Sequence, residues 1–238
     1  MVSRIYVEKK PGFDVEAQQL LQELHTVITD GLSQAVTLRI INMYDVEGIT
    51  DELFQQCVPT VFSEPQVDNA SLTLPVEGAL VGAAGSGEGL VSAPEGVHIF
   101  AVEPLPGQFD QRADSASECI QLISQGERPL VRSVKVYVLE GDLSHETFEA
   151  IKHYIINPIE SREASLALRD TLAMQIPEPK PVEVLEGFID LDEEGLKQFL
   201  ADRGLAMDLA DITFFQKYFR ETEKRNPTIT EVKVVDTY

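Results

Sequence analysis

Apolar and polar positions recur in two matching sets along the chain, and each set predicts the same order of strands and helices. Residues 4–8 and 36–46 alternate as strands do, whereas apolar residues three and four positions apart predict a helix over 14–28. A second helix is predicted to begin at Thr50, and a short strand is predicted over 70–74. This first set is therefore a strand-helix-strand-helix-strand unit.

The same order returns in the second half of the chain. Strands are predicted over 98–102 and 133–139, one helix follows Asp110, and another carries Phe148. The set closes at 164–168, which is expected to be its third strand. Both sets contain the same five elements in the same order.

The two sets also keep nearly constant spacing. The sequence Ala-Ser-Leu-Thr-Leu at 70–74 returns as Ala-Ser-Leu-Ala-Leu at 164–168, and Phe54 returns as Phe148, in each case 94 residues later. Shared order and shared spacing predict a duplicated domain, with repeats over about 2–75 and 97–168. Pseudo-two-fold pairing of the repeats would bury the apolar face of each.

The fold class predicted from these patterns is α+β. We expect a pseudo-dimeric domain over 1–168 with a mainly antiparallel sheet, followed by a small, mostly helical domain over 189–238. The glycine-rich segment 76–96 is expected to be a flexible surface connection between the repeats, and the proline-rich segment 169–188 an extended linker. Residues 228–237 alternate and are predicted to form a strand, at which we expect a longer protein to have been cut.

Composition narrows the class of protein. The 238 residues are 43% hydrophobic and 25% charged, which is typical of a globular domain, and the net charge of −21 argues against a nucleic-acid partner. No run approaches the ~20 apolar residues that a membrane span needs. The first residues already have a strand pattern and no secretion signal, so we expect a cytoplasmic protein.

A search for reactive groups finds no catalytic, cofactor-binding or metal-binding residues. Cys57 and Cys119 lie at apolar helix positions and are interpreted as buried free thiols. His145 and His153 are too far apart on one helix to share a metal ion without further ligands. The acidic run 190–194 would suit Mg²⁺, but its place at a helix start favours capping, with Asp192 as the cap.

The glycine content of the segment 76–96 raises the alternative of a phosphate-binding loop. Such a loop ends in Gly-Lys-Ser/Thr, and this segment contains no lysine. The chemistry is therefore expected to lie outside this chain.

Several long segments resemble the amino-terminal region of the phosphoribosylformylglycinamidine synthase family. The resemblance covers nearly the whole chain except the glycine-rich segment 76–96. The segments that carry it are RIYVEK at 4–9, LPGQFDQRADSA at 105–116, CIQLISQGERP at 119–129, INPIESRE at 156–163 and NPTITE at 226–231.

The resemblance implies a large cytoplasmic enzyme that uses ATP, Mg²⁺ and glutamine-derived ammonia to convert formylglycinamide ribonucleotide to the amidine. It implies a non-catalytic amino-terminal domain similar to a dimer of a small separate subunit, then a helical linker domain. The partners implied are the remaining synthase and glutaminase domains of the same polypeptide, and weak self-association of the fragment is left open. In the family, a substrate segment follows the positions of Asp236, Thr237 and Tyr238.

Five residues of the second repeat are candidate inter-domain contacts: Gln108, Gln111, Arg112, Asn157 and Arg162. The argument is strongest for Gln111-Arg112. Both repeats place an aspartate, Asp14 or Asp110, where it would cap a helix, but the first repeat continues with Val15-Glu16. The shared fold therefore does not require an arginine at this place.

A guanidinium group suits a carboxylate or phosphate, so Arg112 is predicted to be accessible and to contact the synthase half. The alternative is a local ion pair with Asp110 or Asp114. For the chain as a whole, the alternative function is a free-standing pseudo-dimeric regulatory module that binds a small metabolite between its repeats.

Overall fold

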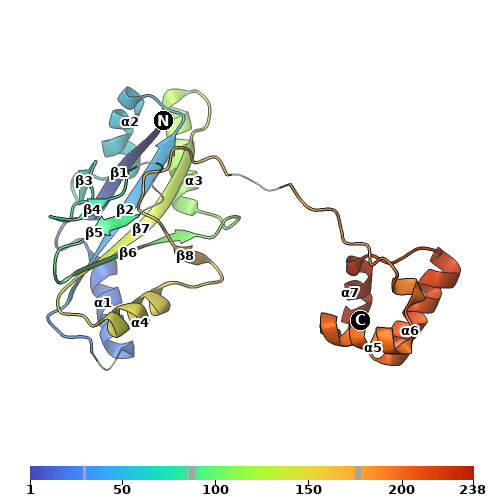
Figure 1. Cartoon of the computed structure of the whole chain (residues 1–238). Coiled ribbons are helices and arrows are strands. Elements are labelled where there is room, and N and C mark those ends of the chain that lie inside the picture. Colours follow the sequence, from blue (N-terminus) through green and yellow to red (C-terminus); the bar gives the residue numbers. More distant parts are fainter. Residues whose placement is uncertain (29–30, 84, 86–88, 175–177) are drawn as a thin grey trace. The chain divides into compact units, whose positions relative to one another are not determined.

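The computed structural model describes residues 1–28, 31–83, 85, 89–174 and 178–238, which divide into two compact units (Figure 1). The amino-terminal unit ends at Met174, and the carboxy-terminal unit extends to Tyr238. None of the helices in these residues has the length and apolar character that crossing a membrane requires.

The amino-terminal unit is built on one large antiparallel sheet. Its strands, in spatial order, are β3 (Asp68–Ser71), β1 (Val2–Lys9), β2 (Thr37–Glu47), β7 (Leu130–Glu140), β6 (Val97–Pro104) and β8 (Ser161–Glu163). Every neighbouring pair is antiparallel. The unit is therefore α+β with an antiparallel sheet, as the sequence predicts.

The strand order and register agree with the predicted duplication. The central ladder runs from Thr37 opposite Glu140 to Glu47 opposite Leu130, with Asn42 opposite Lys135 at its middle. On either side, β1 flanks β2 and β6 flanks β7, and a short strand forms each edge. A pseudo-two-fold axis near the middle of the ladder would produce this arrangement. Common origin of the repeats stays a prediction.

Four helices pack on one face of this sheet (Figure 1). They form two pairs, and each pair contains one helix from each repeat. Helix α1 (Val15–Val27) shares a core cluster with α4 (His145–Ile155), around Leu24 and Ile151. Helix α2 (Asp51–Cys57) and the π-helical turn that follows it share another with α3 (Gln111–Ser124). The repeats are therefore held together by helix packing as well as by the central ladder.

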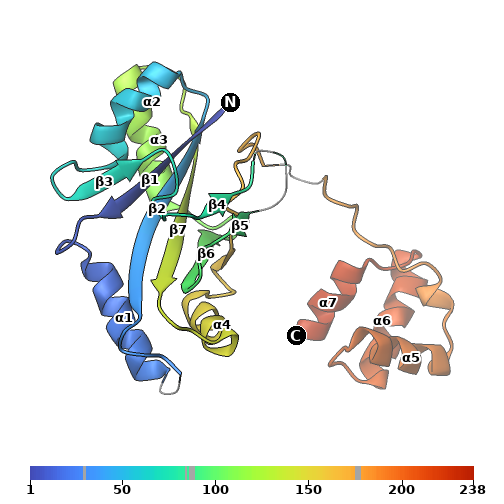
Figure 2. The same ribbon diagram turned by 60° about the vertical axis from the view of Figure 1, so that its left-hand side comes forward.

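The other face of the sheet is covered by the glycine-rich segment, which was expected to be a flexible surface connection. That expectation was wrong for the described residues. Val76, like Leu74 just before the segment, is buried against the sheet, and Val81 of β4 (Leu80–Val81) and Leu90 of β5 (Leu90–Ser92) pack on the same cluster. Figure 2 shows β4 and β5 beside the large sheet. The apolar residues between the glycines cover a sheet face that would otherwise be exposed, while residues 84 and 86–88 lie outside the description.

Two local predictions in this unit also need correction. The third strand of each repeat, β3 or β8, begins two or three residues earlier than predicted. Ala164 and Leu166 therefore lie after β8, outside any strand, although both are buried in the core. Asp14 precedes α1 but makes no capping bond, because its carboxylate accepts from the Gly12 N–H and the Gln18 side chain, each at 2.9 Å. Asp110 does cap α3, accepting from the Ala113 N–H at 3.0 Å.

The carboxy-terminal unit contains a short 3₁₀ turn (Phe188–Asp190) and helices α5 (Glu193–Arg203), α6 (Leu209–Tyr218) and α7 (Ile229–Thr237), with a π-helical turn after α6 (Phe219–Glu223). Asp192 is the N-cap of α5, as predicted, and Asp208 is the N-cap of α6. Gly204 ends α5 in the left-handed conformation. Leu185 and Phe188, placed by the sequence in the linker, belong to this unit's core.

Residues 228–237 were predicted to be a strand, and this was wrong, because they form α7. Thr228 caps the helix, its hydroxyl accepting from the Glu231 N–H at 3.2 Å while the Glu231 carboxylate accepts from the Thr228 N–H at 2.8 Å. Val232 is fully buried in the core of the unit. Capping and packing thus outweigh the strand preference of the β-branched residues.

Candidate functional site

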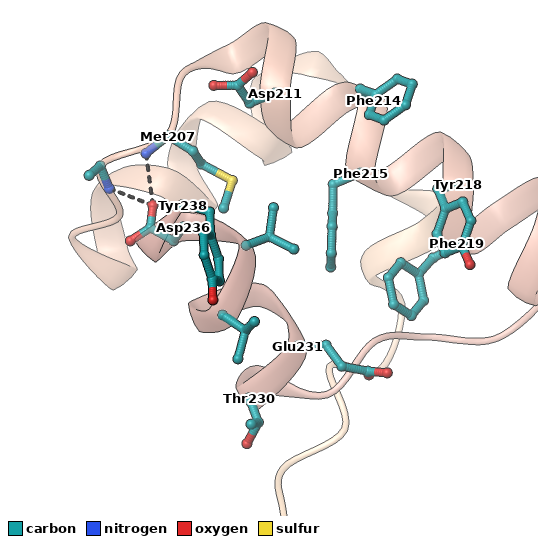
Figure 3. Close-up of a pocket in the computed structure, with 13 residues that line it drawn as sticks. Met207, Asp211, Phe214, Phe215, Tyr218, Phe219, Thr230, Glu231, Asp236 and Tyr238 are labelled. Carbon is teal, nitrogen blue, oxygen red and sulfur yellow. Dashed lines mark hydrogen bonds between the residues drawn. The ribbon is translucent and has the colours of Figure 1, made fainter.

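The carboxy-terminal unit has an apolar groove between α6 and α7, with a volume of about 880 Å³ (Figure 3). Phe215 and Phe219 form its floor and belong to the core of the unit. Phe214 and Tyr218 line the groove from the exposed side of α6, with 76% and 45% of their surfaces accessible. Val234 and Val235 line it from α7 and are also exposed.

The spacing of the aromatic residues explains why this surface exists. Helix α6 and the turn after it carry two pairs of adjacent aromatic residues, Phe214-Phe215 and Tyr218-Phe219, four positions apart. Residues four apart share a face of a helix, whereas adjacent residues point in directions about 100° apart. When Phe215 and Phe219 enter the core, Phe214 and Tyr218 are left on the surface. An exposed apolar surface of this kind is typical of a binding site.

The charged residues that line the groove are all acidic: Asp211, Glu231 and Asp236. Glu231 is held by Arg225, whose Nη2 lies 2.6 Å from Oε1. This bond, followed by the bond from the Thr228 N–H, lowers the pKa of Glu231 to about 2, so the carboxylate is ionised at neutral pH. The groove therefore presents an apolar floor and an acidic rim, on which Glu231 is paired with Arg225 while Asp211 and Asp236 are in no ion pair among the described residues.

The residues expected to adjoin the substrate segment lie at the end of α7. The Asp236 carboxylate accepts from the N–H groups of Ala206 and Met207 at 2.7 and 2.8 Å, so it ties α7 to the loop between α5 and α6 (Figure 3). The Thr237 hydroxyl donates to the Lys233 carbonyl at 2.8 Å. Tyr238 lines the groove. Asp236 and Tyr238 thus belong to the groove, and Thr237 bonds within its own helix.

Three of the candidate contacts in the amino-terminal unit lie together. Gln108, Gln111 and Arg112 line a pocket of about 440 Å³ at the start of α3. Arg112 is exposed, as predicted, and its Nη1 donates to the Tyr44 hydroxyl at 3.4 Å. Within the described part of the chain, no ion pair involves Arg112. The guanidinium therefore remains available to an anion.

The alternative of a local ion pair fails because both neighbouring aspartates are engaged elsewhere. Asp114 pairs with Arg128 at 2.6 Å. Asp110 caps α3 and also accepts from the Ser133 hydroxyl at 2.9 Å. The placement of Arg112 is therefore consistent with an external contact, which stays a prediction.

The other two candidates have different settings. Asn157 shapes the turn before β8, since its Oδ1 accepts from the Ile159 N–H at 3.1 Å. Arg162 lies in an adjacent pocket that Gln108 also lines, and its Nη2 is 2.8 Å from a Glu103 carboxylate oxygen. Gln108 thus lines both of the pockets that contain arginines, whereas Asn157 stabilises a turn.

Both cysteines were predicted to be buried, and this holds for Cys57 but is wrong for Cys119. Cys57 is buried in the core between α2 and α3, and burial, with the nearby Cys119, raises the pKa of its thiol. Cys119 is exposed, because it lies on the outer side of α3. Among the residues that the structure describes, no group of three His, Cys, Asp or Glu side chains is arranged to hold a metal ion.

Sequence reasoning missed Phe214, Tyr218 and Arg169 as candidate site residues. The paired aromatic residues were a readable signal for the first two. Arg169 reaches Glu103 only through the register of the sheet, which the sequence does not display.

The chain matches no protein-family model and no curated protein sequence.

Proposed function

We propose that this chain is the non-catalytic amino-terminal scaffolding region of a phosphoribosylformylglycinamidine synthase. In this proposal it belongs to a cytoplasmic ATP- and glutamine-dependent ligase that converts formylglycinamide ribonucleotide to the amidine in purine biosynthesis. ATP and Mg²⁺ act in the synthase domain of the parent enzyme. The two units described above hold the synthase and glutaminase domains of the same polypeptide in position.

The sequence segments that resemble the family are the starting point of the proposal, and the architecture supports it. An antiparallel sheet with symmetric strand order is what a fused pair of small subunits would form. A separate helical unit follows, as the family pattern of a linker domain implies.

The observation that carries the scaffolding role is the apolar groove of the helical unit. Phe214 and Tyr218 expose aromatic surface in the groove, and buried aromatic anchors supply much of the free energy of association in protein interfaces. The acidic rim favours an occupant with basic residues around an apolar core. We assign this occupant to a segment of the synthase domain.

The native gene gives the first test of this proposal. Reading the transcript past the codon for Tyr238 should reveal a continuing frame. The encoded polypeptide should convert formylglycinamide ribonucleotide with glutamine and ATP, and deletion of residues 1–238 should abolish that activity. A stop codon directly after Tyr238, or full activity of the deleted enzyme, would refute the scaffolding role.

A second test addresses the groove. In the complete polypeptide, Phe214→Ser should lower the turnover of the ligase, because the anchor is lost. Leu122→Ser is the matched control, since Leu122 is equally exposed, at 72%, but lies on α3. Thermal unfolding of the 238-residue chain should be nearly the same for both variants. Equal activity of the two variants would show that the groove does not dock the synthase domain.

A further inference from the structure

A buried carboxylate in the amino-terminal unit is surrounded by three arginines. Glu103 is 6% exposed, and its oxygens lie 2.7 Å from Arg132 Nε, 2.8 Å from Arg162 Nη2 and 3.1 Å from Arg169 Nη2. Arg132 comes from β7, Arg162 from β8 and Arg169 from the segment after β8. One carboxylate cannot neutralise three guanidinium groups, so positive charge is in excess here.

In the first repeat, the glutamate equivalent to Glu103 is Glu8, and it is bonded to one arginine, Arg39. Glu8 and Glu103 are each the seventh residue of an eight-residue strand, and Arg39 and Arg132 are each the third residue of an eleven-residue strand. Arg39 holds both Glu8 oxygens at 2.7 Å. One arginine therefore satisfies the glutamate that this fold places there.

The two additional arginines have no counterpart in the first repeat. Arg162 is the second residue of β8, and the second residue of β3 is Asn69. Arg169 follows the 164–168 segment, where Pro75 follows the matching segment 70–74. Because the first repeat forms the same elements without arginines at these positions, the presence of Arg162 and Arg169 needs another explanation.

The surplus of positive charge persists when Asp45, the second carboxylate bonded to Arg132, is included. Asp45 joins Arg132 to Arg4, at 2.9 and 2.6 Å. Among the residues that the structure describes, the network joined by these bonds holds four arginines and two carboxylates, an excess of two positive charges in a chain whose net charge is −21. Asp110 lines the same pocket but caps α3 and is not bonded to this network. Like charges held together cost free energy unless an anion joins them.

Glu103 and the arginines Arg132, Arg162 and Arg169 line a pocket of about 330 Å³. Arg162 and Arg169 are 47% and 39% exposed, and among the described residues the partner of each is Glu103, so guanidinium N–H groups remain to donate. Leu130, Leu172 and Met174 provide an apolar wall. An apolar wall with a few convergent polar groups is typical of a small-molecule site rather than of a flat protein interface.

We propose that this pocket binds the phosphate group of a small organic phosphate monoester. A phosphate monoester carries nearly two negative charges at pH 7, because its second pKa is about 6, and this charge matches the surplus of the network. Its oxygens accept from both guanidinium forks, while the organic part contacts the apolar wall. The inference does not depend on the proposed ligase function.

Calorimetric titration of the full chain tests the proposal with phenyl phosphate, inorganic phosphate and benzoate. Phenyl phosphate should bind most tightly, inorganic phosphate more weakly and benzoate least. Arg162→Gln and Arg169→Gln should each weaken phenyl phosphate at least about tenfold, since each removes charge-assisted hydrogen bonds. Glu103 keeps Arg132 in both variants, so the melting temperature without ligand should change by less than ~4 °C.

Arg128→Gln is the control, because Arg128 is a half-exposed arginine of the same unit that pairs with one carboxylate, Asp114. This variant should bind phenyl phosphate as the unchanged chain does. Failure of the unchanged chain to bind phenyl phosphate at millimolar concentration would overturn the proposal. Equal binding by the Arg162→Gln, Arg169→Gln double variant, or equal binding of benzoate, would overturn it as well.

Discussion

Replacing Asp45 with asparagine would remove the negative charge that joins two buried arginines across the sheet. Asp45 has no exposed surface, and the side chains of Arg4 and Arg132 are 8% and 10% exposed. Its Oδ1 accepts from Arg4 Nε at 2.6 Å, and its Oδ2 accepts from Arg4 Nη2 and Arg132 Nη1, both at 2.9 Å. The asparagine amide can accept at one atom only, and its NH₂ would face guanidinium donors.

The expected loss is about 3–5 kcal/mol, the cost of removing one partner from a buried ion pair. This is a large part of the ~5–15 kcal/mol by which a typical domain is stable. Asp114→Asn provides the comparison, because Asp114 pairs with Arg128 on the surface, where the side chains are 43% and 44% exposed. A surface pair contributes about 0–1 kcal/mol, so this variant should unfold almost as the unchanged chain does.

Urea denaturation followed by far-ultraviolet circular dichroism would measure both losses. Because the chain has two compact units, a global signal mixes their transitions, so hydrogen exchange of peptides from β2 and β7 should identify the amino-terminal unit. A loss for Asp45→Asn below about 1 kcal/mol, or no larger than that for Asp114→Asn, would refute the reasoning. The arginines would then be held by the remaining contacts alone.

Three further predictions concern single residues. Burial by itself raises the pKa of Glu103, but the surrounding arginines outweigh burial and hold the pKa below its ordinary 4.5. The ionised form of Glu103 therefore stabilises the unit above that pH, and this stabilisation is lost as pH falls through the lowered pKa. When the free energy of unfolding is measured against pH, it should fall less steeply in acid for Glu103→Gln than for the unchanged chain. Thr228→Ala should destabilise the helical unit by ~1 kcal/mol in urea, through loss of the α7 cap. Gly141→Ala should lower the melting temperature more than Gly107→Ala. Both glycines have positive φ, 143° and 90°, but only at Gly141 would the added Cβ also lie 2.9 Å from Val36 Cγ2, whereas the Cβ at Gly107 meets no atom within 4 Å.

The fold class could be predicted because most of its signals are local. Alternation over 36–46 and 133–139 identified the two central strands, which are buried over most of their length. Thr50 and Asp192 were recognisable as N-caps, and both side chains accept the expected backbone N–H. The internal spacing of the sequence also indicated which elements would correspond across the sheet, since matching residues recur at a nearly constant separation.

Where prediction was wrong, contacts from distant parts of the chain decide the structure. The β-branched residues of 228–237 favour a strand when considered alone, but Val232 packs into the helical core, and Thr228 with Glu231 forms a capping box. That Thr-x-x-Glu pattern is present in the sequence and is typical of a helix start. The segment 76–96 had the glycine content of a free connection, yet its apolar residues cover one face of the sheet.

The candidate sites were less predictable than the fold, for a related reason. Arg112 could be selected because one repeat was compared with the other at a single position. Arg162 was selected from its segment, but its setting depends on Glu103 and on Arg169, seven residues further along the chain. Only the register that places β6 between β7 and β8 brings these groups to one carboxylate. The exposure of Phe214 likewise depends on which aromatic residues enter the core.

Comparison of the repeats separates residues that serve the fold from residues that serve something else. A pseudo-symmetric sheet makes similar demands at equivalent positions, and it meets them with similar residues, as at Glu8 and Glu103. At three positions the second repeat has an arginine, Arg112, Arg162 or Arg169, where the first has a glutamate, an asparagine or a proline. All three differences add positive charge to one repeat of an acidic chain. Because the first repeat has the same elements without these arginines, anion binding of the kind proposed above would account for all three differences together.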